Sequence, residues 1–114
     1  MPRLVRELLG DILDEARFLA SEVKKRTQED FLSDGLSQRA FVRSIEIIGE
    51  ASKKIPVEVR FLDSSIPWRS VCAMRDRLIH DYSGVDYIIV WDVAANEAPN
   101  LSQKIERLLA ALPE

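Results

Sequence analysis

Apolar residues follow a helical spacing through most of the chain. Near the N-terminus they recur every three or four positions and form one stripe: Leu4, Leu8, Ile12, Ala16, Leu19 and Val23. Residues at this spacing lie on one face of an α-helix. The pattern therefore predicts a first amphipathic helix of about 20 residues.

The same spacing predicts three further helices in the middle of the chain. Thr27 is a suitable N-cap for a short helix, because acidic residues follow it directly. A longer helix should end before Pro56, with these residues on or near its buried side: Ala40, Ile45, Ile48, Ala51 and Ile55. Another should begin near Pro67 with Val71, Met74 and Leu78 as its stripe. Trp68 and Trp91 lie near apolar positions, which favours the core over stacking on bases.

The C-terminal third is expected to be helical after a break at Gly84. Asp86 can cap a helical region over residues 87–112, bent or interrupted near Pro99. Residues 87–93 are rich enough in β-branched side chains to resemble a strand, but their helical neighbours favour a helix. The whole pattern predicts an all-α, up-and-down bundle of four to five helices in one domain, residues 1–114.

Composition narrows the class of protein. With 46% apolar and 31% charged residues, the chain has the balance of a soluble globular domain. No secretion signal or long apolar run stands out, which predicts a cytoplasmic protein without a membrane span. The single cysteine and single histidine make a metal centre improbable, and no cofactor is expected. The net charge of −3 argues against a large nonspecific nucleic-acid footprint.

Candidate chemistry lies in "MRDRLIHDY", residues 74–82, which contain the chain's one histidine, His80. On an ideal helix Arg75 and His80 are about 140° apart, so they converge only if the helix loosens or a second subunit adds a wall. Asp76 is four residues before His80 and could orient its imidazole, while Arg75 and Tyr82 are seven apart on one face. The spacing is equally consistent with these being ordinary polar side chains on a helix surface, with no catalytic role.

This segment resembles the HEPN superfamily, and within it the HepT-like toxins of toxin–antitoxin pairs. The family signature is R-x4-H-x-Y with a polar residue after the arginine, and the segment carries it without departure. Residues 47–56, "IIGEASKKIP", and the longer block of residues 66–91 are also similar to the family. The resemblance covers most of residues 40–101 and implies a HEPN-like helical fold.

The resemblance implies a metal-independent endoribonuclease that uses the 2′-hydroxyl of RNA as the nucleophile. His80, with an ordinary pKa of about 6.5, would move protons. Arg75 would stabilise charge on the phosphate, and Asp76 would fix the imidazole tautomer. Arg77 and Arg69 are further candidates for substrate binding. The products would be a 2′,3′-cyclic phosphate and a 5′-hydroxyl end.

The resemblance also implies partners. HEPN proteins act as homodimers with two motifs facing a cleft, and the small residues Gly49 and Ala51 would let helices approach closely. A cognate minimal nucleotidyltransferase antitoxin (MNT) would silence the toxin by transferring AMP to Tyr82. The alternative is a non-catalytic helical binding subunit of such a nucleotidyltransferase.

Overall fold

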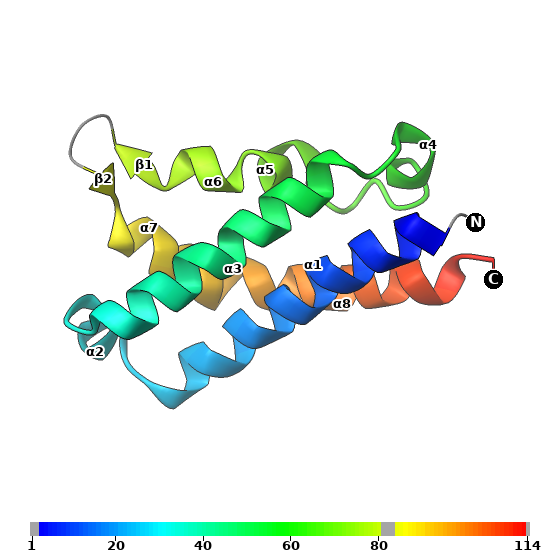
Figure 1. The fold of residues 1–114 in the computed structure, drawn as a ribbon. Helices are drawn as coiled ribbons and strands as arrows, with labels where there is room; N and C mark the ends of the chain where they lie inside the picture. The colour runs from blue at the N-terminus through cyan, green and yellow to red at the C-terminus, as the bar shows by residue number, and fades with distance from the viewer. Residues whose placement is uncertain (1–2, 81–83, 114) are drawn as a thin grey trace.

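Three long helices form the frame of the bundle: α1 (Arg3–Glu22), α3 (Gly35–Lys53) and α8 (Ala98–Ala111). The computed structural model describes residues 3–80 and 84–113, without the side chains of residues 3 and 80. α1 packs against both α3 and α8 (Figure 1). Arg6 joins the start of α1 to the end of α8, because its Nη2 donates to the carbonyl oxygen of Leu112 at 2.9 Å. The predicted all-α fold is confirmed.

The stripe predicted for the first helix is buried except at its two ends, since Val23 is only partly buried and lies beyond α1. Leu8, Ile12, Ala16 and Leu19 are at most 9% exposed. Leu4 is 63% exposed, so its assignment to the stripe is wrong, and Val5 is buried in its place. Leu4 lies eight residues before Ile12 and is turned about 80° from it, whereas Val5 lies within about 20°. The helical period therefore selects Val5.

Side-chain caps set the start of the next two helices. A 3₁₀ turn, η1 (Val23–Lys25), leads to the short α2 (Gln28–Leu32). Thr27 caps α2 as predicted, because its Oγ1 accepts from the backbone N–H of Asp30 at 3.1 Å. Asp34 caps α3 by accepting from the N–H of Leu36 at 3.1 Å. α3 ends at Lys53, before Pro56, as expected.

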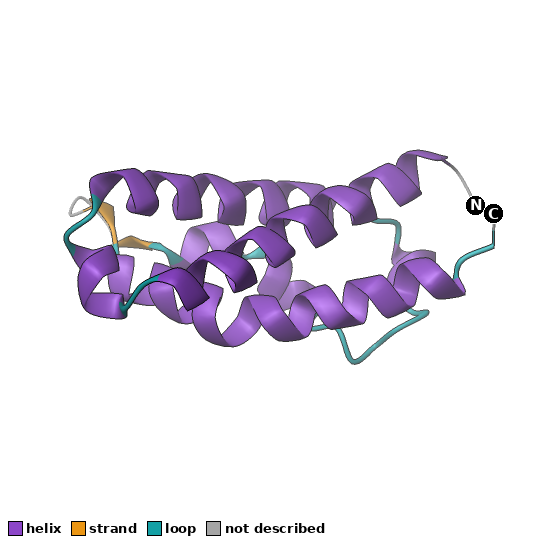
Figure 2. Cartoon of the chain, turned by 90° about the horizontal axis from the view of Figure 1, so that it is seen from below, coloured by secondary structure: helices purple, strands orange, loops and turns teal. Residues whose placement is uncertain are grey.

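The helix expected over the motif is interrupted, which corrects the prediction. After α4 (Val57–Arg60), the segment forms α5 (Trp68–Cys72) and α6 (Met74–Arg77), separated at Ala73. Two short antiparallel strands follow, β1 (Ile79–His80) and β2 (Gly84–Val85). Gly84 has φ +87°, a value that glycine adopts without strain. Figure 2 shows this hairpin at the end of the bundle opposite the termini.

The C-terminal region is helical from residue 87, as predicted. Asp86 caps α7 (Tyr87–Asp92) by accepting from the N–H groups of Ile88 and Ile89. The interruption expected near Pro99 is a π-helical turn, η3 (Val93–Glu97), directly before α8. Among the described helices, none is both long and apolar enough to cross a membrane.

α3 comes close to the motif helices at Gly49. A Cβ added to Gly49 would lie 3.6 Å from the carbonyl oxygen of Cys72 and 3.9 Å from the backbone N of Arg75. Ala51, on the same helix, is 6% exposed. Both small residues, expected to serve contacts between subunits, are therefore used for packing within one chain.

Aromatic rings fill the core between α2, α3 and α7. Phe41 is 1% exposed and lies 4.7 Å from Phe31 and 6.5 Å from Trp91, measured between ring centroids. Trp68 is 8% exposed and donates through Nε1 to the carbonyl oxygen of Arg60. The prediction that both tryptophans belong to the core is confirmed, since Trp91 packs against it.

Phe41→Ala should lower the free energy of unfolding by about 3–5 kcal/mol, because it leaves a cavity among these rings. Phe61→Ala is the matched control, since Phe61 is 78% exposed and its loss should cost within about 0.5 kcal/mol. Urea denaturation followed by circular dichroism measures both values. Equal stability of the two variants would contradict the assigned core.

Candidate active site

Arg75 is held at the surface of α6 by an ion pair with α3. Its Nε lies 3.4 Å from Oε2 of Glu46, and the two side chains are 50% and 28% exposed. This contact engages the Nε edge of the guanidinium, so its terminal nitrogens can serve a second anion. Glu46 was not identified from the sequence because it lies 29 residues before Arg75.

A cavity of about 220 Å³ opens beside this ion pair. Of the residues that the structure describes, six line it, from α3, α6, the two short strands and the link between α6 and β1: Val42, Glu46, Arg75, Leu78, Ile79 and Val85. Leu78 is 1% exposed and forms the buried part, while Ile79 is 47% exposed. The cavity therefore has mostly apolar walls with one ion pair at its edge.

The other motif residues leave the helix on which their spacing was reasoned. α6 ends at Arg77 and His80 lies in β1, where its backbone is paired with Gly84. The arguments from helical angles between Arg75, Asp76, His80 and Tyr82 therefore do not apply. Asp76 is exposed on α6. Tyr82 lies outside the described residues.

The backbone nevertheless brings Arg75 and the backbone of His80 close together. β1 follows α6 after a single residue, and Ile79, next to His80, lines the cavity that Arg75 borders. Among the described residues, no group of three or more histidine, cysteine, aspartate or glutamate side chains gathers as a metal site. The arrangement offers an anion-binding guanidinium beside an apolar hollow.

Arg77 is bound to the C-terminal helices. Its Nη1 and Nη2 donate to the two carboxylate oxygens of Glu97 at 2.9 and 2.7 Å, and Nη1 also donates to Oγ of Ser70. The hydrogen bonds to Glu97 raise the pKa of Arg77 above its usual value. Arg77 thus fastens α6 to the π-helical turn.

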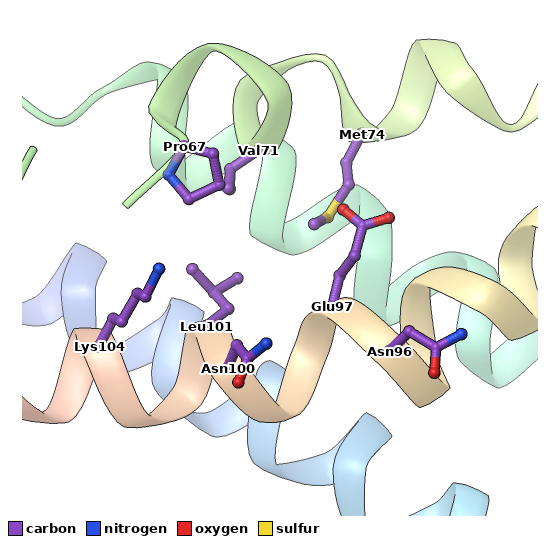
Figure 3. A pocket seen from close by; sticks show the side chains of 8 residues that line it. All are labelled: Pro67, Val71, Met74, Asn96, Glu97, Asn100, Leu101 and Lys104. Atoms are coloured by element: carbon purple, nitrogen blue, oxygen red, sulfur yellow. The ribbon is translucent and has the colours of Figure 1, made fainter. Parts of the chain in front are cut away.

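Glu97 also borders a small cavity of about 140 Å³ between α5–α6 and α8, drawn in Figure 3. Val71, Met74 and Leu101 line its apolar part. Lys104 at its edge donates to the carbonyl oxygen of Ser65 at 2.8 Å. The charged groups at this cavity are therefore used to hold the bundle together.

Arg77→Met should lower the free energy of unfolding by about 1–2 kcal/mol, because it leaves a half-buried Glu97 carboxylate without its bidentate partner. Arg17→Met is the matched control. Arg17 pairs with Glu106 at 3.2 Å with both side chains more than half exposed, so its loss should cost about 0–1 kcal/mol. Urea denaturation of both variants tests this, and equal costs would contradict a fastening role.

Arg69 lies apart from the Arg75 cavity. It is exposed on α5 and borders a shallower hollow of about 500 Å³ with Phe61, Trp68 and Cys72. Cys72 is a free thiol of intermediate burial rather than a fully buried one. The structure thus brings Arg75 and the backbone of His80 together, but places Arg69 on a different part of the surface.

Comparison with known proteins gives a consistent picture. The family described as "Ribonuclease HepT-like" matches residues 12–108. A protein of Caldanaerobacter subterraneus subsp. tengcongensis named as a candidate RNase is 46% identical over 104 residues, which are 91% of this chain and 93% of that protein. The "Probable ribonuclease HepT" of Thermococcus cleftensis is 41% identical, covering 95% and 98% of the two chains. No solved structure gives a significant match. The chain belongs to the HepT-like ribonuclease family.

Proposed function

We propose that this protein is a metal-independent endoribonuclease and the toxin of a toxin–antitoxin pair. The observation that carries the proposal is the exposed Arg75, positioned by Glu46 beside the strand that contains His80. Membership of a ribonuclease family supports RNA as the substrate. The motif order, Arg75 then His80 then Tyr82, supports the finer assignment.

The proposed reaction uses the nucleophile that RNA carries. The 2′-oxygen attacks the adjacent phosphorus, a P–O2′ bond forms and the P–O5′ bond breaks. His80 takes the 2′-hydroxyl proton or returns one to the leaving 5′-oxygen. The products are a 2′,3′-cyclic phosphate and a 5′-hydroxyl, and no oxidant, reductant or added water is consumed.

Arg75 supplies the charge that this reaction needs. Negative charge concentrates on the non-bridging phosphate oxygens as the 2′-oxygen attacks, and a guanidinium can donate two parallel hydrogen bonds to them. Glu46 holds Nε and so limits the rotation of the guanidinium before RNA binds. The motif order alone supports a role for Asp76 in orienting the His80 imidazole, because the helical spacing that first suggested it does not apply.

The two other arginines receive different roles. The guanidinium of Arg77 already binds Glu97 and Ser70, which favours a structural role over substrate binding. Arg69 is exposed and could contact RNA only outside the Arg75 cavity, so we assign it a weak contribution to affinity.

We propose that the protein is a homodimer with the two motifs beside the interface. The exposed large apolar residues of α2, α3 and α7 support this: Leu32, Leu36 and Ile88. These elements meet at the hairpin end of the bundle (Figure 1). Burying such a patch between two copies would stabilise a small domain and place two Arg75 side chains near one cleft.

Ile88→Glu should therefore convert the dimer to a monomer, because it places a charge in the apolar interface. Phe61→Glu is the matched control, since Phe61 is 78% exposed and directly follows α4, which lies at the end of the bundle away from the hairpin (Figure 1). Light scattering at micromolar concentration measures the mass of each variant. A monomeric unchanged protein would remove the basis for a shared cleft.

Incubation of purified protein with single-stranded RNA in the presence of EDTA tests the proposed function. Cleavage should persist with the chelator. Complete absence of cleavage by pure, folded protein would favour the alternative, a non-catalytic binding subunit for a nucleotidyltransferase.

A further inference from the structure

The aliphatic walls and the size of the cavity beside Arg75 have no part in the proposed reaction. Its walls include three aliphatic side chains that are not fully buried, Val42, Ile79 and Val85. Its volume of about 220 Å³ is smaller than a typical drug-sized pocket and suits a single small ring system. A polar phosphate gains nothing from these aliphatic walls, whereas an apolar ring would pack against them.

We propose that this cavity binds one nucleobase next to the scissile phosphate, and that Glu46 selects a base with an exocyclic amino group. The inference rests on the proposed function. A base flanking the phosphate on Arg75 is covalently tied to that phosphate, so it is available to the adjoining hollow. Flat base faces pack on aliphatic surfaces, and the bases of single-stranded RNA expose their hydrogen-bonding edges.

The choice of base follows from the chemistry of a carboxylate. Ionised Glu46 only accepts hydrogen bonds. The exocyclic amino group of cytosine donates to it, whereas the O4 oxygen of uracil at the same position is repelled. Uracil can donate only through N3–H, directly beside that repelled oxygen, so cytosine should bind more tightly. Cytosine and uracil have nearly the same shape, so a preference between them reports this contact rather than the size of the cavity.

Glu46→Gln separates the two contacts of this side chain. Loss of the ion pair with Arg75 slows cleavage of every substrate alike. The amide of glutamine both donates and accepts, so it can satisfy either cytosine or uracil. Glu50→Gln is the matched control, because Glu50 is an exposed carboxylate one turn further along α3 and does not line the cavity.

The experiment uses the full chain and oligodeoxynucleotides with a single ribonucleotide, so that cleavage can occur at only one bond. The base on each side of that bond is varied between cytosine and uracil. Parallel fluorescence-anisotropy titrations use 2′-fluoro oligonucleotides of the same sequences, which cannot be cleaved.

At one of the two positions, the unchanged protein and Glu50→Gln should prefer cytosine roughly tenfold in cleavage and in binding. Glu46→Gln should bring this ratio close to one. A ratio near one at both positions in the unchanged protein, or a ratio that survives Glu46→Gln, would overturn the inference even if cleavage occurs. Base-dependent binding without any cleavage would support the base pocket and remove the proposed function instead.

Discussion

Arg75→Ala is expected to lower the rate of RNA cleavage at least a hundredfold while leaving the helical fold intact. The loss follows because, among the described residues that line the cavity, Arg75 alone carries a positive charge to stabilise the phosphate. Truncation opens no cavity in the core, since the Arg75 side chain is 50% exposed.

Arg43→Ala is the matched control for Arg75→Ala, because Arg43 is an exposed arginine on α3 that does not line the cavity. It should cleave within about twofold of the unchanged protein. His80→Ala should lose cleavage as Arg75→Ala does, since proton transfer by a positioned group contributes about 10²–10⁴-fold. Cleavage at the unchanged rate by either motif variant would show that the assigned mechanism is wrong.

If the proposed nucleotidyltransferase antitoxin modifies this chain, co-produced protein is expected to be heavier by one or more AMP units, attached at Tyr82. Each unit adds a negatively charged phosphodiester and a bulky nucleoside next to the motif. The attached phosphate would occupy Arg75, and RNA would be excluded by charge and by volume. Intact-mass spectrometry measures the modification.

Tyr82→Phe should lose this mass gain and keep at least partial cleavage, because a phenol with a pKa near 10 is a poor base at neutral pH. Tyr87→Phe is the matched control and should keep the mass gain, since Tyr87 packs against the core through Phe31. An unmodified Tyr82 in a fully inhibited complex would mean that the partner acts by simple occlusion.

Local sequence signals predicted most of the fold. Thr27 and Asp86 cap helices as expected because each acts on backbone groups only two or three residues away. Residues 87–92 are helical despite their β-branched side chains, because one face of α7 packs into the core through Val90. Pro99 lies in the first turn of α8, directly after the π-helical turn, where its missing backbone N–H leaves no helical hydrogen bond unmade.

The motif region could not be predicted in the same way. Ala73 is a good helix former, so nothing local indicated the break between α5 and α6. The pairing of Ile79 and His80 with Gly84 and Val85 replaces helical spacing there, so the helical angle assumed between Arg75 and His80 does not hold. The role of Glu46 could have been suspected only because it lies four residues after Val42 and three before Gly49, on the same face of α3.

The end chemistry of the RNA products tests the central claim most directly. The unchanged protein would be incubated with a single-stranded RNA in EDTA, beside the same RNA carrying 2′-O-methyl groups, and the products examined by mass spectrometry. Attack by the 2′-hydroxyl predicts 2′,3′-cyclic phosphate and 5′-hydroxyl ends from the unmodified RNA, and no cleavage of the methylated one. Products with 3′-hydroxyl and 5′-phosphate ends, or cleavage that stops with EDTA, would contradict a metal-independent mechanism centred on Arg75 and His80.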